Sequence, residues 1–505
     1  MSENQIADPF PDSKWNPAAR TAAWGLIAFG AIVRLWLFSR NYSLWMDEAM
    51  LALNIRGRSF AQLAKPLDYD QGAPIGFLFL TKLATSMFGN RDFALRLVPM
   101  FSSLLLLFIF MVLMRRLFSP WPGLIGLALV ACSQTFADYA AQDKQYESDA
   151  AIAILLVFLT LMALHNRGAV WIGLLAAAGF CSIWLSHPCV FILAGAGLTA
   201  LVFAHRHHDR RLLVGIAAAA GAWLVAFFCD WFFFLRSLAA NPHLLAHWST
   251  GFIPRPIFSV NAVHWFVRTF YIDCGFLIGS DTGRVLSAAL ASVILVGFLH
   301  LQQSRFVLFS LIGLPAFFTL CAAALKKYPF DGRLITFLMP LFGVLAAAGA
   351  DAIHRALRPD ATALRISLLS SFMLLPFLQA LEMLGTSQEK EGIKPVLAFV
   401  HDHFQPHDAL YVYHGAQPAF DFYTVNSAIP ADSIIRGVES PSDWQRYADE
   451  VTSLPAGRVW LIFSHYKEWG DGDETLPIRL FASERGKLLD SRETTGTVAY
   501  LYELR

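Results

Sequence analysis

The chain has 505 residues, of which 56% are hydrophobic and only 15% are charged, and its formal net charge is +1. Long apolar runs with so few charges are typical of an integral membrane protein. The near-neutral balance provides no basic surface for nucleic acid, so we expect no nucleic-acid partner.

The N-terminal segment, residues 1–21, precedes a first apolar run that no A-x-A cleavage pattern follows, so we interpret that run as an uncleaved helix. Each apolar run is near the length that a bilayer core requires. The runs cover 22–39, 97–114, 120–137, 150–164, 168–186, 188–204, 212–235, 283–301, 306–325, 334–350 and 366–385. The sequence therefore predicts a polytopic α-helical membrane protein with about eleven spanning helices.

A shorter apolar stretch, "PIGFLFLTKLATSMFG" at 74–89, carries Lys82 and is interpreted as a helix lying in the membrane interface. With this assignment, five short basic loops fall on the side of the N-terminus, as the positive-inside rule requires of a cytoplasmic side. These loops are 114–116, 165–167, 205–211, 302–305 and 354–358. The outer loops 40–96 and 138–149 and the tail 386–505 are then expected on the non-cytoplasmic side.

Two adjacent carboxylates, Asp47 and Glu48, follow the first apolar run in "YSLWMDEAMLAL". They could be helix-start acids, because carboxylates are stabilised in the first turn of a helix. They could also be functional, because the next outer loop carries a matching set of polar residues.

That next loop, "FADYAAQDKQYESDAAIAI" at 136–154, holds acids, two tyrosines and a lysine between two apolar runs. On a helix, Tyr139, Gln142 and Tyr146 share one face and Lys144 lies to its side. Interfacial tyrosines and a snorkelling lysine would explain the aromatics and the cation. They explain less well the four acids, which are Asp138, Asp143, Glu147 and Asp149.

Two later outer junctions add candidate residues. His187 in "LSHPCVF" is either a cap or packed residue or a substrate contact. Lys326, Lys327 and Arg333 in "KKYPFDGR" place positive charge on the non-cytoplasmic side, against the usual bias. We interpret these three cations as a pocket for a negatively charged group.

The tail after about residue 386 is predicted to be a small soluble α/β domain. "GIKPVLAFVHDHF" has helical periodicity, whereas "ALYVYHG", "RVWLIFSH" and "VAYLYELR" are typical of strands. The domain organisation is thus a 1–21 segment, a transmembrane domain over 22–385 and a domain over 386–505.

Four motifs together resemble the GT-C class of membrane glycosyltransferases. They are the Asp-Glu pair after the first run, "GAPIGF" with "FGNRDFALRLVP", the Y-x-x-Q-x-K-x-Y-x-x-D pattern and "YPFDGR". The resemblance covers roughly 22–350 and is to the dolichyl-phosphate-mannose protein mannosyltransferase-like family. That family includes bacterial aminoarabinose transferases and the Rgt-type sugar transferases of lipopolysaccharide assembly.

The resemblance implies an inverting transfer of a hexosyl or pentosyl group from a polyprenyl-phosphate donor to a lipid, glycan or protein acceptor. Asp47 matches the family's catalytic carboxylate and would be the general base, with Glu48 beside it. The family pattern has an acid where Gln142 stands, so either Asp143 or Asp149 substitutes for it or no second carboxylate is needed. Lys144, Arg333 and Lys326 or Lys327 would hold the donor phosphate, with Tyr139, Gln142, Tyr146 and His187 near the substrate.

Two alternatives stay open at this point. The first is a transporter or flippase of lipid-linked saccharides, because polar residues in membranes also mark permeation paths. The second is a catalytically inactive relative that acts as a binding scaffold. The sequence implies no particular cofactor and leaves a divalent metal open, and its six cysteines show neither zinc nor disulfide spacing. We expect the membrane to be the bacterial inner membrane.

Overall fold

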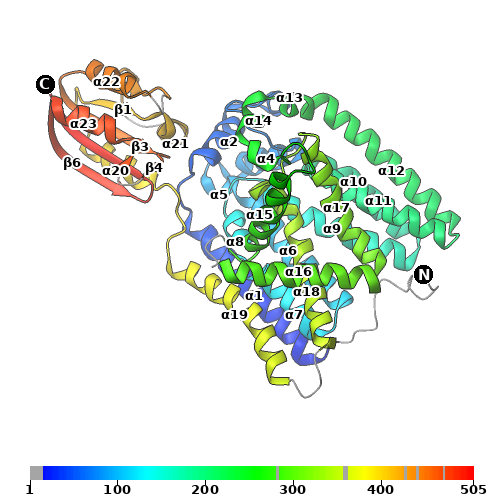
Figure 1. The fold of residues 1–505 in the computed structure, drawn as a ribbon. Helices are drawn as coiled ribbons and strands as arrows, with labels where there is room; N and C mark the ends of the chain where they lie inside the picture. Colours follow the sequence, from blue (N-terminus) through cyan, green and yellow to red (C-terminus); the bar gives the residue numbers. More distant parts are fainter. Residues whose placement is uncertain (1–14, 280–283, 357–361, 426–428, 440–442, 470–471) are drawn as a thin grey trace. The chain divides into compact units, whose positions relative to one another are not determined.

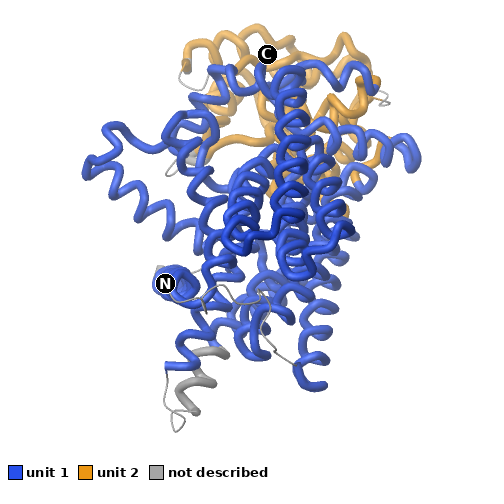
Figure 2. Tube along the Cα trace, turned by 90° about the vertical axis from the view of Figure 1, so that its right-hand side faces the viewer, with its two compact units in different colours: residues 1–40, 60–89, 93–386 blue, residues 41–59, 90–92, 387–505 orange. Residues whose placement is uncertain are grey.

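The computed structural model describes residues 15–279, 284–356, 362–425, 429–439, 443–469 and 472–505. Residues 1–14 of the expected N-terminal segment and 357–358 of the last basic loop lie outside the described residues. The chain divides into two compact units (Figure 2). Unit 1 comprises residues 1–40, 60–89 and 93–386, and unit 2 comprises 41–59, 90–92 and 387–505.

Unit 1 is helical, and eight of its described helical segments are long and apolar enough to cross a membrane. They are α1 (Pro17–Arg40), α6 (Leu97–Leu117), α9 (Tyr146–Asn166), α11 (Cys189–Arg206), Arg210–Ala239 with α12 (Arg210–Asp230), α16 (Arg284–Ser304, spanning from Val285), α17 (Phe306–Ala324) and Gly332–Ala356 with α18 (Met339–Ala356). The bent pair α7 (Pro120–Ala131) and α8 (Gln134–Ala140) could form one more span. The expected polytopic helical fold is confirmed, but the expected count of about eleven spans is not.

The remaining helices of unit 1 are shorter. Apolar α10 (Ala169–Leu185), α4 (Ile75–Phe88) and the described Ser371–Gly385 part of α19 (Thr362–Gly385) fall below the length of the eight spans. The others are α3 (Phe60–Leu63), α14 (Pro242–His247) and α15 (Val260–Phe276), and α5 (Asp92–Leu95) lies across the unit boundary. Every expected apolar run therefore coincides with a helix, and the expected interfacial helix is α4.

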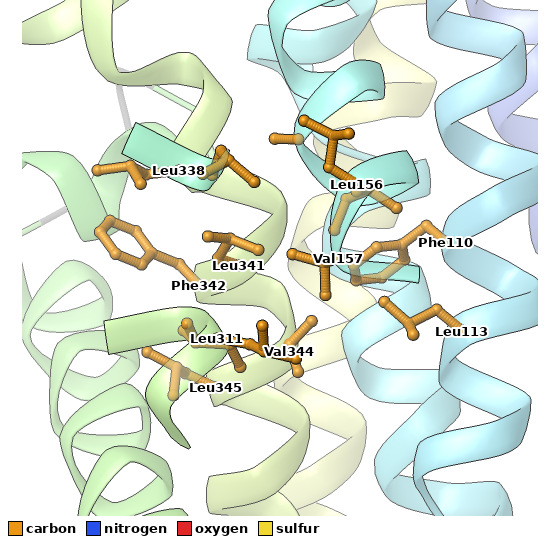
Figure 3. Packing of buried hydrophobic residues seen from close by; sticks show 14 of the residues in the cluster. Phe110, Leu113, Leu156, Val157, Leu311, Leu338, Leu341, Phe342, Val344 and Leu345 are labelled. Atoms are coloured by element: carbon orange, nitrogen blue, oxygen red, sulfur yellow. The ribbon is translucent and has the colours of Figure 1, made fainter. Parts of the chain in front are cut away.

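The bundle core is built from apolar side chains on all faces of the central helices. Figure 3 shows Phe110 of α6 and Val157 of α9 on one side of this core and Leu341 of α18 on the other. Every residue of α18 from Met339 to Asp351 is buried. A helix that is apolar all round must lie inside a bundle, so α18 and α9 form its centre.

Contacts between the basic segments place them at one end of the unit 1 bundle. The contacts join Arg305 Nη1 to the Leu117 carbonyl oxygen (2.7 Å), Arg116 Nη1 to Met162 Sδ (2.9 Å), the Arg167 guanidinium to the Phe203 ring (5.4 Å) and the Arg206 guanidinium to the Phe306 ring (5.5 Å). Asp351 Oδ2, which binds Arg355 Nη2 within α18 (2.8 Å), lies 3.9 Å from His300 Nε2 of α16. The Trp15 indole, next to α1, donates to the Phe118 carbonyl oxygen at the same end. The assignment of this end to the cytoplasm stays a prediction from the positive-inside rule.

A fully buried arginine joins three helices where the bent α7–α8 pair breaks. Arg34 of α1 is 0% exposed, and its Nε donates to Ser103 Oγ of α6 at 2.7 Å. Its Nη1 and Nη2 donate to the carbonyl oxygens of Ala131 (2.7 Å) and Val130 (3.2 Å), the last residues of α7. Because the last carbonyls of a helix have no intrahelical partner and hydrocarbon offers none, Arg34 supplies the donors that this break requires.

Unit 2 contains a five-stranded sheet in the order β2-β1-β3-β7-β6 (Figure 1). The strands are β1 (Ala409–Val412), β2 (Ile434–Arg436), β3 (Gly457–Ser464), β6 (Gly486–Thr494) and β7 (Thr497–Leu504), with a separate pair of β4 (Glu468–Trp469) and β5 (Gly472–Asp473). β1 is parallel to β2 and β3, whereas β7 is antiparallel to both β3 and β6. The predicted α/β domain and its three predicted strands are confirmed.

Helices cover both faces of this sheet. α20 (Ile393–His403) packs its Phe399 ring against Trp460, which points to one face of β3. α22 (Trp444–Ser453) and α23 (Leu476–Arg485) bury Val451 and Ile478 against the other face, where Phe463 lies. Because β3 is covered on both faces, its sequence is a continuous apolar run and not an alternating one. Unit 2 also contains α2 (Met46–Gly57) and α21 (Gln417–Thr424).

Replacing Arg34 by Met should lower the unfolding temperature of the purified protein by several degrees. The change removes the donors for two buried carbonyls, and each unsatisfied buried group costs about 1–3 kcal/mol. Thermal unfolding in detergent measures the effect, and Arg20→Met, an exposed arginine on the same helix, is the matched control. Equal unfolding temperatures for the two variants would show that Arg34 does not stabilise the break.

Candidate functional site

The two acids of the opening motif lie in the first turn of α2, in unit 2. Asp47 is half-buried, whereas Glu48 is only 1% exposed. Adjacent residues on a helix point about 100° apart, which explains the different surroundings. Glu48 is therefore enclosed in unit 2, and Asp47 is the more accessible carboxylate of the pair.

The start of α2 is held by acids that lie far away in the sequence. The Met46 backbone N–H donates to Glu391 Oε2 at 2.9 Å, and Ser43 donates through its N–H (3.0 Å) and its hydroxyl (2.8 Å) to Glu389 Oε1. The first N–H groups of a helix need such acceptors, and the N-cap Trp45 has no side-chain cap of its own. Glu391 thus caps the helix that carries Asp47, and Glu389 holds Ser43, three positions before the helix begins.

Further contacts fix the segment on both sides of Asp47. The Leu44 N–H donates to the Tyr423 hydroxyl at 2.8 Å, and that hydroxyl donates to Asp92 Oδ2 at 2.8 Å. The Lys394 ammonium bonds the same Asp92 oxygen at 2.7 Å. Arg56, in the last turn of α2, donates to the Phe422 carbonyl oxygen at 2.6 Å. The backbone around Asp47 is therefore positioned before any substrate binds.

A histidine at the end of β3 lies next to this helix start. His465 Nδ1 is 2.7 Å from Glu391 Oε1, and His465 adopts a left-handed backbone with φ of 54°. The hydrogen bond to Glu391 raises the pKa of His465, burial opposes that rise, and the charges of Glu391, Asp47 and Glu474 add to it. Asp47, Glu391 and His465 thus form one electrostatic group in unit 2, which we call the His465 group.

In unit 1, the junction of α8 and α9 gathers the second set of predicted residues. The rings of Tyr139 and Tyr146 are 4.9 Å apart, but the expected single helix is wrong, because a turn separates Tyr139 in α8 from Tyr146 in α9. Gln142, in the short turn between the helices, donates through Nε2 to Asp138 Oδ2 of α8 at 2.6 Å. Gln142, at the position of the family acid, therefore bonds an acid of its own loop.

Lys144 and Asp143 lie inside the protein. Lys144 is 4% exposed and its ammonium donates to Gln71 Oε1 at 2.9 Å. The neighbouring Asp143 is 0% exposed. Gln145, the last residue of this turn, donates through Nε2 to the Gly72 carbonyl oxygen at 3.4 Å. The turn 143–145 is thus packed against residues 71–72, so a buried positive and a buried negative group are adjacent in the chain.

Asp149 lies one turn into α9 and is 6% exposed. Burial and the charges of Asp149 and Tyr146 raise the pKa of the Tyr328 phenol, which donates to the Leu334 carbonyl oxygen at 2.7 Å.

Burial lowers the pKa of His187, in the turn between α10 and α11, to about 4. His187 is therefore neutral near pH 7 and would act as a hydrogen-bonding group and not as a cation.

The predicted phosphate-binding cations separate into two groups. The Arg333 guanidinium lies 5.9 Å from the Tyr146 ring centroid and 5.3 Å from that of Trp248, so aromatic faces hold it at the α8–α9 junction. Lys326 and Lys327 are exposed in the turn after α17. Among the described residues, no hydrogen bond or ion pair joins either lysine to the junction. Arg333 and Lys144 are therefore the cations that the structure places there.

The fourth acid of the loop has a different environment. Glu147 is 0% exposed and interacts electrostatically with Arg34, the buried arginine of α1. Both residues lie in the bundle core, where Arg34 also donates hydrogen bonds to two carbonyl oxygens of α7. Sequence reasoning missed Arg34, although a single arginine inside an apolar run was a signal that could have found it. It also missed Tyr328, Glu391 and His465.

No metal site is evident in the described part of the chain. No group of three or more His, Cys, Asp or Glu side chains there is arranged to hold a metal ion. The cysteines at all six positions are free thiols. The described carboxylates can transfer protons, and Lys144 and Arg333 can supply electrostatic stabilisation.

The His465 group predicts a specific pH dependence of stability. The pKa of His465 is raised above its usual value of 6.5. The charged pair of His465 with Glu391 is therefore fully stabilising below pH 6.5, and this stabilisation is lost as the pH rises through the raised pKa. The difference in unfolding temperature between the unmodified protein and His465→Gln should therefore shrink with rising pH. Thermal unfolding from about pH 5.5 to about pH 9 measures it.

The exposed His403 on α20 provides the matched control for this titration. Its variant His403→Gln should keep the pH dependence of the unmodified protein. A difference between the unmodified protein and His465→Gln that is constant with pH would contradict the assigned ion pair.

Residues 72–251 match a family model described as dolichyl-phosphate-mannose-protein mannosyltransferase. This range contains the α8–α9 junction and His187 but not Asp47 or Arg333. No curated protein matches the chain.

Two solved structures share the fold over nearly the whole chain. The crystal structure of ArnT from Cupriavidus metallidurans in the apo state has a TM-score of 0.55 and 14% identity, covering 96% of this chain and 98% of that one. The structure of the same protein bound to undecaprenyl phosphate has a TM-score of 0.51 and 14% identity, covering 94% and 97%. The chain is thus an integral membrane protein with the fold of ArnT, and the resemblance to GT-C class glycosyltransferases that its motifs predicted is confirmed.

Proposed function

We propose that this protein is a glycosyltransferase that moves a sugar from a polyprenyl-phosphate donor to a lipid, glycan or protein acceptor, with inversion at the sugar. The observation that carries the proposal is the buried polar junction of α8 and α9, within the segment that matches the mannosyltransferase family model. A buried ammonium and an arginine held by aromatic rings suit a phosphate leaving group, which is a dianion at its departure. The undecaprenyl phosphate bound to ArnT supports this donor class.

In the proposed reaction, Asp47 accepts the proton of the acceptor hydroxyl or amine as that group attacks the anomeric carbon. The new bond forms opposite the bond to phosphate, which breaks and leaves its electron pair on the phosphate oxygen. Lys144 contributes a point charge and Arg333 a planar set of donors to the phosphate. Asp149 and Asp143 are the candidates for a second carboxylate at the position where Gln142 departs from the family pattern.

We further propose that the reaction occurs on the non-cytoplasmic face of a bacterial inner membrane. The basic segments at one end of unit 1 support this orientation, because such segments face the cytoplasm. α9 runs from the α8–α9 junction to the basic segment 165–167, so the junction lies at the opposite end of α9 from that segment.

Asp47→Asn should lower the turnover of a radiolabelled polyprenyl-phosphate sugar by about a hundredfold or more, the usual worth of a general base. The amide keeps the size and the hydrogen bonding of the carboxylate but not its basicity. A panel of hexosyl and pentosyl donors, assayed with purified protein, provides the measurement. Glu48→Gln is the matched neighbour, and near-normal transfer by Asp47→Asn with no transfer by Glu48→Gln would assign the base to Glu48.

The same assay separates the alternatives. Transfer of label to an acceptor supports the enzyme, movement of the intact lipid-linked sugar across liposomes without transfer supports a flippase, and binding with neither supports a scaffold. The flippase or scaffold result would overturn the proposed function.

Arg333→Gln should weaken the binding of undecaprenyl phosphate about tenfold or more, because hydrogen bonds to charged groups are among the stronger ones. Calorimetry or a fluorescence titration in detergent measures the affinity. Lys326→Gln, which removes an exposed cation, is the matched control and should bind nearly as tightly as the unmodified protein. An equal loss in both variants would indicate a general charge effect and not a specific contact.

A further inference from the structure

A cavity of about 430 Å³ lies on unit 1 among α11, α16 and α17. Its size is within the range of small-molecule sites. Leu198 and Phe317, which line it, are 44% and 55% exposed, so the cavity opens on the outer surface of the bundle, where lipid chains are the solvent. Its walls are almost entirely apolar, with Phe298 of α16 and Gly313 of α17 among them. An acyl chain suits such a lining.

One end of the cavity is charged. Arg206, the last residue of α11, lines the cavity and is exposed, with its guanidinium 5.5 Å from the Phe306 ring. This is the end of the bundle where the basic segments meet, and a cytoplasmic leaflet presents anionic headgroups at that depth. Arginine recognises phosphate through parallel N–H donors, so Arg206 suits a lipid phosphate.

A buried hydroxyl in the same cavity points independently to a ligand. Thr199 of α11 is 5% exposed, and its Oγ1 has no hydrogen-bond partner among the described residues. Other helical hydroxyls in the bundle bond the carbonyl four residues earlier, as Thr160 does with Leu156 and Thr319 does with Pro315. An unsatisfied polar group in a membrane is costly, so Thr199 requires an acceptor that enters the cavity. The ester oxygen of a phospholipid is such an acceptor.

The spacing of the two polar groups fits one lipid. Thr199 and Arg206 are seven residues apart, and the rise of 1.5 Å per residue separates them by about 10 Å along α11. From the Arg206 end, a ligand would thus meet a cation first, then a hydroxyl and then apolar walls. A phospholipid has the same order of phosphate, ester and chain.

We propose that this cavity is a binding site for one anionic phospholipid of the leaflet at the basic end, with its phosphate on Arg206, an ester oxygen on Thr199 and an acyl chain between α11 and α17. The site is separate from the α8–α9 junction and does not depend on the proposed transfer reaction.

Native mass spectrometry of the full-length protein tests the site, with phosphatidylglycerol and phosphatidylcholine of identical chains as probes. One phosphatidylglycerol should be retained per chain, in preference to phosphatidylcholine. Arg206→Gln should weaken retention about fivefold, the usual worth of one arginine at an anionic surface. Thr199→Val, which removes only the hydroxyl function, should weaken retention of both lipids about two- to tenfold.

Gly313→Leu should abolish retention by filling the cavity, since a Cβ at Gly313 already lies 3.3 Å from the Phe298 ring. The control is Arg20→Gln, an exposed arginine near the N-terminal end of α1 that does not line the cavity, and it should leave retention unchanged. Equal retention of both lipids with no effect of Arg206→Gln would overturn the site. Displacement of phosphatidylglycerol by equimolar undecaprenyl phosphate would overturn its assignment to a phospholipid.

Discussion

The structure of unit 1 depends on one constraint, which is that hydrocarbon offers no hydrogen bonds to a polypeptide. Backbone groups must therefore be satisfied inside the chain, and continuous helices do this along most of each span. The break between α7 and α8 is an exception, and there Arg34 donates to the carbonyl oxygens of Ala131 and Val130. The buried Glu147 is the carboxylate that interacts electrostatically with this arginine in the core.

The same constraint explains the α8–α9 junction. Ending α8 early and starting α9 with a polar turn allows Asp143 and Lys144 to lie inside the protein close to a membrane boundary. Their burial has an electrostatic cost, and Gln71 and the residue 143–145 turn supply part of the compensation. Arg333 is placed at the junction by packing between aromatic rings, which leaves the geometry of its guanidinium fixed before a ligand binds. A site with fixed charges of this kind is suited to a phosphate.

In unit 2, the C-terminal domain also positions the segment that carries Asp47. Glu391 caps α2, and Glu389 accepts two hydrogen bonds from Ser43 just before that helix. The Tyr423 hydroxyl accepts the Leu44 N–H, and His465 shares Glu391 with the helix start. The segment 41–59 has only 19 residues and one helix of 12 residues, which would be marginal in isolation. Its conformation, and with it the orientation of Asp47, therefore depends on side chains more than 300 positions later in the chain.

The sequence by itself determined the membrane class, the position of every apolar helix and the α/β character of the tail, because hydrophobic length and periodicity are local properties. It also identified the polar loop 138–149, since acids beside apolar runs are visible without a structure. The tertiary structure alone decided which of those acids face which partners. Glu147 and Asp149 are only two residues apart, yet Glu147 interacts with Arg34 whereas Asp149 interacts with Tyr328.

The tertiary structure alone also decided that the Asp47 segment belongs to the same compact unit as the C-terminal sheet. Sequence grouped this segment with the transmembrane domain, because its apolar neighbours are close in the chain. Its capping acids and His465 lie beyond residue 386, and no local pattern connects a helix start to acceptors at such a separation. Pairing between distant side chains depends on how the chain folds back on itself, and periodicity and composition carry no information about that.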